Sequence, residues 1–322
     1  IFTIHNLGYQ GIFKPEVVPL LGLGWGLFTP AGIEFYGKVN LLKGGLLFAD
    51  LLTTVSPRYS QEIQTPEQGF GLDGVLRQRS GDLFGILNGI DPEEWNPATD
   101  PHIAARYTAA DLSGKAVCKR DLQQRFRLPE NAETPVLGVV SRLAGQKGLD
   151  LLRDITADLM KLDLQLVLLG SGERVLEASF IQAAAQHPSR LGVKIGFDIP
   201  LSHQIEAGAD LFLMPSRYEP CGLNQMYSLA YGTIPVVRAT GGLDDTIVTF
   251  DPATGRGNGF KFDEATAAAL LQSIRGALAL FSQKAHWDRV VANAMAGNFT
   301  WDRSAREYEQ LYHRSVAKRG RL

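Results

Sequence analysis

Two basic side chains lie five residues apart in the glycine-containing segment Ser141–Gly148. The apolar run Val136–Val140 before it predicts a strand, and a helix is expected to begin at Leu149, so Arg142 and Lys147 should lie at the carboxyl end of a strand. Arg offers a planar fork of donors and Lys a point charge, which together suit a diphosphate. A solvated loop would explain the pattern of this segment equally well.

A second turn of this kind, Glu219–Leu223, follows the apolar run Leu211–Met214 and precedes a predicted helix. The free N–H groups at a helix N-terminus bind phosphate, whereas a carboxylate there does not, so Glu219 is expected to hold sugar hydroxyls. Its alternative role is to cap the helix. The segment Thr240–Asp245 is another glycine-rich turn, which binds ligand or is simply a tight turn.

The remaining motifs indicate less. Gly170–Glu173 resembles the start of a dinucleotide fingerprint, but Val175 stands where the third glycine belongs, so the pattern does not favour NAD. His203 and Glu206 have the spacing of a metal-binding pair, but no third ligand is evident and structural roles are favoured. His5 ends a predicted strand and could reach a cleft. The sequence has no Walker loop and no Gly-x-Ser-x-Gly elbow.

The elements that must position these residues follow a regular pattern. Short apolar runs separated by helix-length segments predict βαβ units and a doubly wound parallel sheet. The predicted strands are Val136–Val140, Leu164–Leu169, Val193–Phe197, Leu211–Met214 and Ile234–Val237, and the predicted helices are Leu149–Lys161, Leu223–Tyr231 and Ala265–Phe281. The fold class is therefore α/β with Rossmann-like domains.

The domain boundaries follow from the same pattern. Residues 1–86 are expected to be the later part of one α/β domain, 87–97 a linker, 98–300 a Rossmann-like domain and 301–322 a C-terminal helix. The chain opens at Ile1 on a strand that is apolar on both faces, without the neighbours that a parallel sheet requires. We therefore expect a fragment in which the first domain is incomplete.

Composition restricts the class of protein. The 322 residues include 32 Lys+Arg and 34 Asp+Glu, a net charge of −2 that does not indicate nucleic acid or anionic lipid as a partner. No apolar run approaches the ~18 to 20 residues that span a bilayer. The two cysteines, Cys118 and Cys221, suit a reducing cytoplasm.

Taken together, the motifs resemble bacterial glycogen synthase and plant starch synthase over essentially the whole chain. The motifs that carry this resemblance are His5–Gly11, Leu87–Asp91, Ser141–Leu143 with Gln146–Gly148, Pro215–Leu223, Tyr231–Pro235 and Thr240–Leu243. The resemblance implies a GT-B fold, in which two Rossmann-like domains face a cleft. It also implies a retaining hexosyltransferase that moves glucose from ADP-glucose to the non-reducing end of an α-1,4-glucan, without a metal or another cofactor. The implied location is the bacterial cytoplasm, or the plastid if the source is a plant.

The resemblance also assigns roles to particular residues. Arg142 and Lys147 match the cations at the donor phosphates, Glu219 the carboxylate near the glucosyl hydroxyls, and His5 the cleft histidine. These four are the expected catalytic residues. The expected substrate-binding residues are Asn88 near the glucosyl unit, Phe197 beside the adenine, and Cys221, Gly222, Leu223, Asn224, Gly242 and Leu243 around the phosphates and sugar.

The chain departs from the family pattern in two places. Asn224 stands where Thr is more frequent, which is expected to tune binding. The family's Lys-x-Gly-Gly-Leu loop should precede Ile1, and Lys43–Leu46 cannot replace it because it follows the His5 strand. Three alternatives therefore stay open: a related transferase that uses UDP-glucose, a non-catalytic nucleotide-sugar or glucan binding module, and, more distantly, an NAD dehydrogenase. The sequence does not indicate an oligomeric state.

Overall fold

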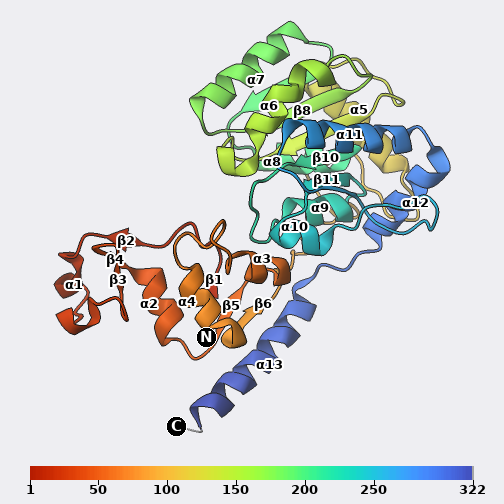
Figure 1. Cartoon of the computed structure of the whole chain (residues 1–322). Coiled ribbons are helices and arrows are strands. Elements are labelled where there is room, and N and C mark those ends of the chain that lie inside the picture. The colour runs from red at the N-terminus through yellow and green to blue at the C-terminus, as the bar shows by residue number, and fades with distance from the viewer. Residues whose placement is uncertain (321–322) are drawn as a thin grey trace. The chain divides into compact units, whose positions relative to one another are not determined.

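The computed structural model describes residues 1–320, which form two compact units. The smaller unit consists of residues 1–88 together with the segment that begins at Asp302, and the larger one spans residues 89–301. Figure 1 shows the elements of both. In the sequence-based division the last segment is a separate helix, whereas its contacts assign it to the smaller unit. The last two residues of that predicted helix lie outside the described part of the chain.

The smaller unit contains two three-stranded sheets. The parallel sheet has the order β1-β5-β6 and the antiparallel sheet the order β2-β4-β3. The strands are β1 (Phe2–Ile4), β2 (Ile12–Phe13), β3 (Glu34–Phe35), β4 (Lys38–Asn40), β5 (Leu52–Thr54) and β6 (Leu83–Gly85). The helices are α1 (Val17–Leu20), α2 (Leu41–Phe48), α3 (Pro57–Glu62), α4 (Asp73–Gln78) and α13 (Trp301–Arg319).

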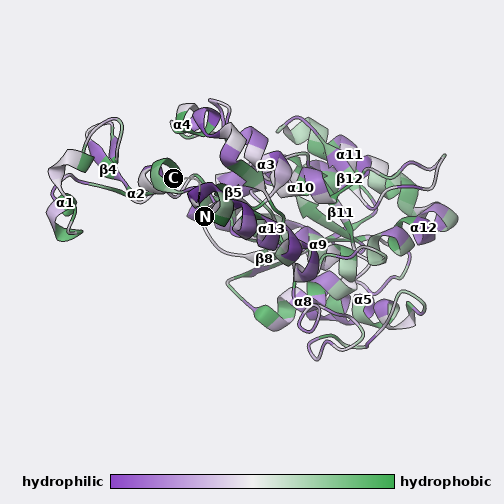
Figure 2. Cartoon of the chain, turned by 90° about the horizontal axis from the view of Figure 1, so that it is seen from below, coloured by the Kyte–Doolittle hydropathy of each residue, from purple (hydrophilic) through white to green (hydrophobic). Residues whose placement is uncertain are grey.

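Helix α13 is mostly hydrophilic and is coloured purple along much of its length in Figure 2. It packs through Leu311, which is buried against Leu51 and Ile86. Lys318 Nζ also donates to Asp82 Oδ2 at 2.7 Å. Ser304, Arg314 and Lys318 also donate to backbone carbonyl oxygens of the smaller unit, so scattered polar contacts attach the helix as well as Leu311, which explains why its hydropathy pattern did not reveal where it packs.

The larger unit is built on a six-stranded sheet of order β12-β11-β10-β7-β8-β9, and every neighbouring pair in it is parallel. Its strands are β7 (Val136–Val140), β8 (Gln165–Gly170), β9 (Leu191–Ile195), β10 (Leu211–Met214), β11 (Ile234–Arg238) and β12 (Phe260–Phe262). Its helices are α5 (Ser113–Arg125), α6 (Leu149–Leu159), α7 (Arg174–Gln186), α8 (Ile199–Gly208), α9 (Asn224–Ala230), α10 (Gly241–Thr246), α11 (Ala267–Phe281) and α12 (Lys284–Met295).

Alternate residues of the strands are buried on opposite faces of this sheet, as the two-residue period of a strand requires. Leu166 and Leu168 of β8 pack in the core formed with α6, α7 and α11. Val167 and Leu169 pack in the core formed with α5 and α8. The sheet is therefore covered on both faces, which confirms the doubly wound α/β class predicted from the continuous apolar runs.

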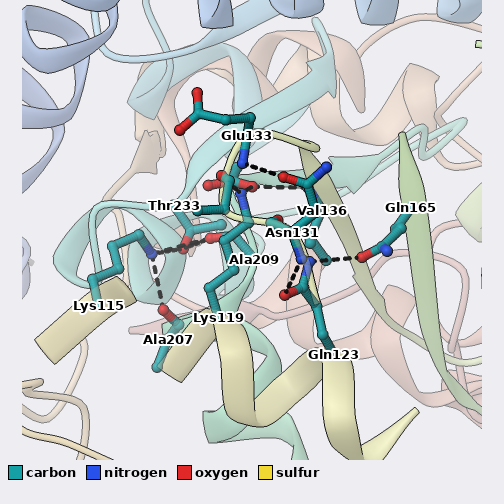
Figure 3. Close-up of polar contacts among 12 residues, drawn as sticks. Lys115, Lys119, Gln123, Asn131, Glu133, Val136, Gln165, Ala207, Ala209 and Thr233 are labelled. Atoms are coloured by element: carbon teal, nitrogen blue, oxygen red, sulfur yellow. Dashed lines mark hydrogen bonds and ion pairs between the residues drawn. The ribbon is translucent and has the colours of Figure 1, made fainter. Parts of the chain in front are cut away.

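A buried polar network lies at the amino ends of β7, β8 and β10 (Figure 3). Lys115 Nζ donates to the carbonyl oxygens of Ala207 and Ala209 and to Thr233 Oγ1 at 2.7–3.0 Å. Lys119 Nζ lies 2.8 Å from Asp210 Oδ2, and both residues are buried. These contacts join α5 to the starts of β10 and β11. They therefore lie at the amino ends of the strands, away from the loops that follow the carboxyl ends.

Replacing Lys119 by Met should lower the free energy of unfolding by about 3 kcal/mol, because Asp210 would be left as a buried carboxylate without its cation. Urea unfolding of the variant measures this loss. The matched control is Lys161→Met, since the Lys161 side chain is 74% exposed and pairs with the half-exposed side chain of Asp158. It should cost less than about 1 kcal/mol. Equal losses in the two variants would contradict the structural role of the Lys119–Asp210 pair.

Candidate active site

The larger unit has a crevice of about 520 Å³ at the carboxyl ends of β7, β8, β9 and β10. Strands β7 and β10 are neighbours, but the chain continues from them toward opposite edges of the sheet, so the crevice lies where the strand order reverses. Open α/β sheets bind their ligands at such a point. The residues that line the crevice include Glu94, Trp95, Arg142, Lys147, Phe197, Asp198, Ile199, Ser202, Glu206, Ser216, Glu219, Gly222, Leu223, Asn224 and Tyr227.

Three of the predicted catalytic residues meet in this crevice. Lys147 Nζ donates to Glu219 Oε2 at 2.6 Å, and the Ser216 hydroxyl donates to the same oxygen at 2.9 Å. Arg142 also lines the crevice, with a guanidinium nitrogen 3.4 Å from Gln146 Oε1. The loop after β7 and the turn after β10 thus bring two cations and one carboxylate together, although they are far apart in the sequence.

An arginine that the sequence analysis did not single out joins these two segments. Arg217 donates from both terminal nitrogens to the carboxylate of Asp150 at 2.6 and 2.7 Å, and from one of them to the carbonyl oxygen of Gly145 at 2.9 Å. Its guanidinium holds the pKa of Asp150 below the usual range. A bidentate pair fixes orientation as well as distance, so it sets the position of the loop that carries Lys147.

Gly148 allows the same two segments to approach closely. Its φ is +65°, and a Cβ at this position would lie 1.9 Å from the carbonyl oxygen of Pro215. Any other residue would therefore clash with the backbone after β10 and strain its own backbone. The sequence showed a glycine at the start of α6 but not the strand that it faces.

The glycine-rich turns differ from each other in what they present to the crevice. Gly222, Leu223 and Asn224 line it, although Asn224 Nδ2 donates to the carbonyl oxygen of Val140 at 3.0 Å. Cys221 is 5% exposed, and its carbonyl oxygen accepts a hydrogen bond from Gln225.

In the other glycine-rich turn, Thr240–Asp245, Gly242 and Leu243 are buried. The amide of Gly242 donates to the carbonyl oxygens of Glu219 and Pro220, and that of Leu243 to the carbonyl oxygen of Thr240. A ligand phosphate would compete with these acceptors.

Aromatic rings form another part of the crevice wall. Phe197 is 90% exposed and follows β9, which ends at Ile195, so the prediction that this strand reaches Phe197 was wrong at its end. The strand stops at Gly196, whose φ of +132° is not an extended conformation. Trp95 is stacked between His203 and Tyr227, with ring centroids 3.9 and 3.7 Å apart. Neither Trp95 nor Tyr227 was singled out from the sequence.

His203 has a structural contact. Its Nδ1 lies 2.8 Å from Asp100 Oδ2, and the Tyr231 hydroxyl donates to the same oxygen at 2.5 Å. Across residues 1–320, no group of three or more His, Cys, Asp or Glu side chains is arranged to hold a metal ion. No helix within this described range is long and apolar enough to cross a membrane.

His5 and Asn88 belong to the smaller unit. His5 is exposed directly after β1, and Asn88 is half-buried shortly after β6. Both therefore follow the carboxyl ends of strands of the same parallel sheet. Lys43, from the tempting Lys-Gly-Gly-Leu segment, lies inside α2, and its ammonium donates to the carbonyl oxygens of Pro30 and Glu34.

The parallel sheet, its helices on both faces and a charged crevice at the strand reversal define a Rossmann-like α/β domain. The family model for glycosyl transferases group 1 matches residues 121–289, and the model for the starch synthase catalytic domain matches residues 1–78. The chain therefore belongs to the glycosyl transferases group 1 family.

Individual proteins give the same result. The chain is 57% identical over 317 residues to the glycogen synthase of Anaeromyxobacter sp. (strain Fw109-5), which covers 98% of this chain and 66% of that protein. It is 54% identical over 315 residues to the glycogen synthase of Koribacter versatilis (strain Ellin345), covering 98% and 65%. The chain thus spans 65–66% of the length of these relatives.

A solved structure supports the fold. The catalytic domain of starch synthase IV from Arabidopsis thaliana, bound to ADP and acarbose, matches with a TM-score of 0.93 and 38% identity. The match covers 98% of this chain and 66% of that one. The GT-B fold that the sequence resemblance implied is confirmed.

Replacing Arg217 by Gln should lower the free energy of unfolding at pH 6 by less than about 1 kcal/mol, because the pair is partly exposed to solvent. The pKa of Asp150 is lowered in the folded protein, so the stability that the pair contributes is present above the usual Asp pKa and is lost as the pH falls through the folded pKa. The difference between wild type and variant should therefore shrink from pH 6 to pH 3. Urea unfolding at both values checks this, and a difference that does not change with pH would contradict the pairing.

Proposed function

We propose that this chain carries the donor site of a glycogen or starch synthase. In this proposal the protein transfers glucose from ADP-glucose to the non-reducing end of an α-1,4-glucan with retention of configuration. The observation that carries it is the meeting of Arg142, Lys147 and Glu219 in one crevice at the strand reversal. The ADP in the related starch synthase structure and the names of the bacterial relatives support the choice of donor and acceptor.

The proposed chemistry follows from the charges. When the glucosyl–phosphate bond breaks, negative charge develops on the leaving diphosphate, and fixed cations stabilise it without reorganising. Lys147 has three N–H donors and uses one on Glu219, so donors are left for phosphate oxygens. Arg142 adds a fork of donors from the same loop.

Glu219 is suited to binding sugar hydroxyls. It is 6% exposed and accepts from both Lys147 and Ser216 through Oε2. Acceptor sites on the carboxylate remain for hydroxyl donors, and the lysine beside it keeps the carboxylate from repelling the diphosphate.

Other carboxylates line the crevice, which the sequence did not show. They are Glu94, Asp198 and Glu206. Asp198 caps the N-terminus of α8 and pairs with Lys194, and burial raises the pKa of Glu206 to about 8. Neither of these two environments suits a nucleophile working with Glu219 as in glycosidases, and Glu94 is exposed to solvent. We therefore propose that the acceptor hydroxyl attacks from the side that the diphosphate leaves.

We also propose that the reaction needs no metal or organic cofactor and takes place in the bacterial cytoplasm. An assay of glucosyl transfer by metal-stripped protein with EDTA present would test the first point, because a requirement for Mg²⁺ or Mn²⁺ would then appear as lost turnover. A UDP-glucose donor and a non-catalytic binding module are the alternatives, and the titration below separates them.

Replacing Arg142 by Ala should slow glucosyl transfer by about 10²-fold, on the order of 3 kcal/mol of lost transition-state stabilisation. It should also weaken binding of ADP-glucose in calorimetric titrations. Arg153→Ala is the matched control, because Arg153 lies on α6 and pairs with the neighbouring Asp154. A loss of rate smaller than threefold for Arg142→Ala would contradict its assigned role.

The titration uses UDP-glucose and NAD as comparators. Selective binding of ADP-glucose supports the proposed donor, and selective binding of UDP-glucose supports the related transferase. Donor binding without transfer to glycogen supports the binding module.

A further inference from the structure

One face of helix α8 lines the crevice. Ile199, Ser202 and Glu206 all line it, and their spacing of three and four residues places them along one face of the helix. Ile199 is 48% exposed, whereas Glu206 is 1% exposed. The crevice therefore narrows along α8 toward Glu206, a buried residue that the proposed chemistry does not use.

The carboxyl group of Glu206 has one oxygen in use and one without a partner. The Ser228 hydroxyl donates to Oε2 at 2.6 Å. Oε1 is buried and has no hydrogen-bond partner within residues 1–320. A buried polar atom without a partner costs about 1–3 kcal/mol, so a ligand atom that paired with Oε1 would remove this cost.

The surroundings of Glu206 indicate what kind of partner this is. Phe197, two residues before α8, has an exposed ring on the same crevice, and Tyr227 lines it too, stacked on Trp95, whose other face is covered by His203. Aromatic walls with one placed polar group are typical of a site for a flat, uncharged ring system. The diphosphate and the glucosyl unit are already accounted for by Arg142, Lys147 and Glu219, which leaves the nucleoside.

We propose that Glu206 is a specificity-determining residue of this crevice and that its Oε1–H donates a hydrogen bond to an uncharged acceptor on the nucleoside of the bound nucleotide sugar. The inference rests on the proposed function, because it presupposes that a nucleotide sugar binds there. It goes further by giving a ligand-binding role to a residue for which the sequence favoured a structural one.

The protonation state required for this role is the one that burial favours. Burial raises the pKa of Glu206 to about 8, against the pull of Lys115, so the group carries its proton at pH 7. Since Oε2 accepts from Ser228, the proton resides on Oε1. A neutral carboxyl group donates a hydrogen bond, which a carboxylate cannot do.

Other titratable groups surround Glu206. Lys115 of α5 titrates in the same range, because burial lowers its pKa to about 8. Tyr107, Tyr227 and Tyr231 also interact with Glu206, and all three have pKa values raised above the usual tyrosine value. Any pH effect must therefore be judged against a variant in which only Glu206 has lost its ability to titrate.

The experiment is calorimetric titration of ADP into wild type, Glu206→Gln and Glu206→Leu at pH 7 and pH 9. Glu206→Gln keeps a donor and should bind within about twofold of wild type at pH 7, whereas Glu206→Leu should bind about tenfold more weakly, as expected for one lost hydrogen bond. From pH 7 to pH 9 wild type should lose about tenfold in affinity as the donor proton dissociates, and Glu206→Gln should not. Glu264→Gln, at an exposed position outside the crevice, is the matched surface control and should behave as wild type.

The analogues 2′-deoxy-ADP and 3′-deoxy-ADP identify the acceptor. If either analogue binds wild type and Glu206→Leu equally, the acceptor is the missing ribose hydroxyl. If the difference between the two proteins persists with both, the acceptor is on the base.

The inference is overturned if Glu206→Leu has the melting temperature of wild type and binds ADP equally well, or if wild type and Glu206→Gln have the same pH dependence. The pH comparison remains decisive even if Glu206→Leu fails to fold. Failure of the proposed function is distinguishable, since wild type would then show no ADP binding that Arg142→Ala abolishes, and the present inference would fall with it.

Discussion

The reversal of strand order between β7 and β10 is the constraint on which the crevice depends. From β7 the chain moves outward through β8 to β9, and α8 then returns it to β10, from which it moves outward in the opposite direction. The segments after β7 and β10 therefore diverge above adjoining strand ends and leave a hollow between them. Arg142, Lys147 and Glu219 all lie on these segments, and Glu206 lies on α8, the helix that makes the reversal.

The same constraint explains how opposite charges come to be held together. The cations follow β7 and the carboxylate follows β10, so only the pairing of these two strands makes them neighbours. The Arg217–Asp150 pair and the close approach of Gly148 to Pro215 fix the distance between the segments. Lys147 and Glu219 then form a short ion pair that lies within the crevice rather than across open solvent. An anionic leaving group and sugar hydroxyls need these two charges side by side, and the backbone supplies that arrangement before any ligand binds.

The sequence allowed five of the six strands in the larger unit's sheet to be predicted, because these are short apolar runs, whereas β12, with Lys261 between two Phe residues, was missed. The strands β7 and β10 were predicted with the observed bounds. It also indicated the carboxyl ends as the site, so Arg142, Lys147 and Glu219 were found from their place after strands. The end of β9 was misplaced because Phe197 continues an apolar run although Gly196 has already ended the strand.

What the sequence could not show depends on contacts between distant segments. Trp95 stacks on rings of α8 and α9, more than a hundred positions further along the chain, and no local period predicts such a contact. Helix α13 packs on the smaller unit through Leu311, a residue type that any amphipathic helix contains. The sequence showed only the spacing of Glu206 from His203, for which a structural role was favoured, whereas its burial and its unpartnered oxygen come from the structure. From the sequence alone, residues could be recognised as candidates for the site only where they lay next to a strand end or a glycine-rich turn.

The groups beneath the crevice also make this region sensitive to pH. The pKa of Glu206 is raised in the folded protein, so the stability it contributes is fully present below its usual pKa of 4.5 and is lost as the pH rises to about 8. The pKa of Lys115 is lowered, so its contribution is present above the usual 10.5 and is lost as the pH falls to about 8. Near pH 8, therefore, Glu206 and Lys115 both lower the free energy of unfolding. A ligand that hydrogen-bonds Glu206 in its neutral form would hold the proton in place and so offset the Glu206 part of this cost, since a ligand that binds only the folded state stabilises it. On this argument, the free energy that the buried carboxyl group costs the empty site is offset when a ligand fills the site.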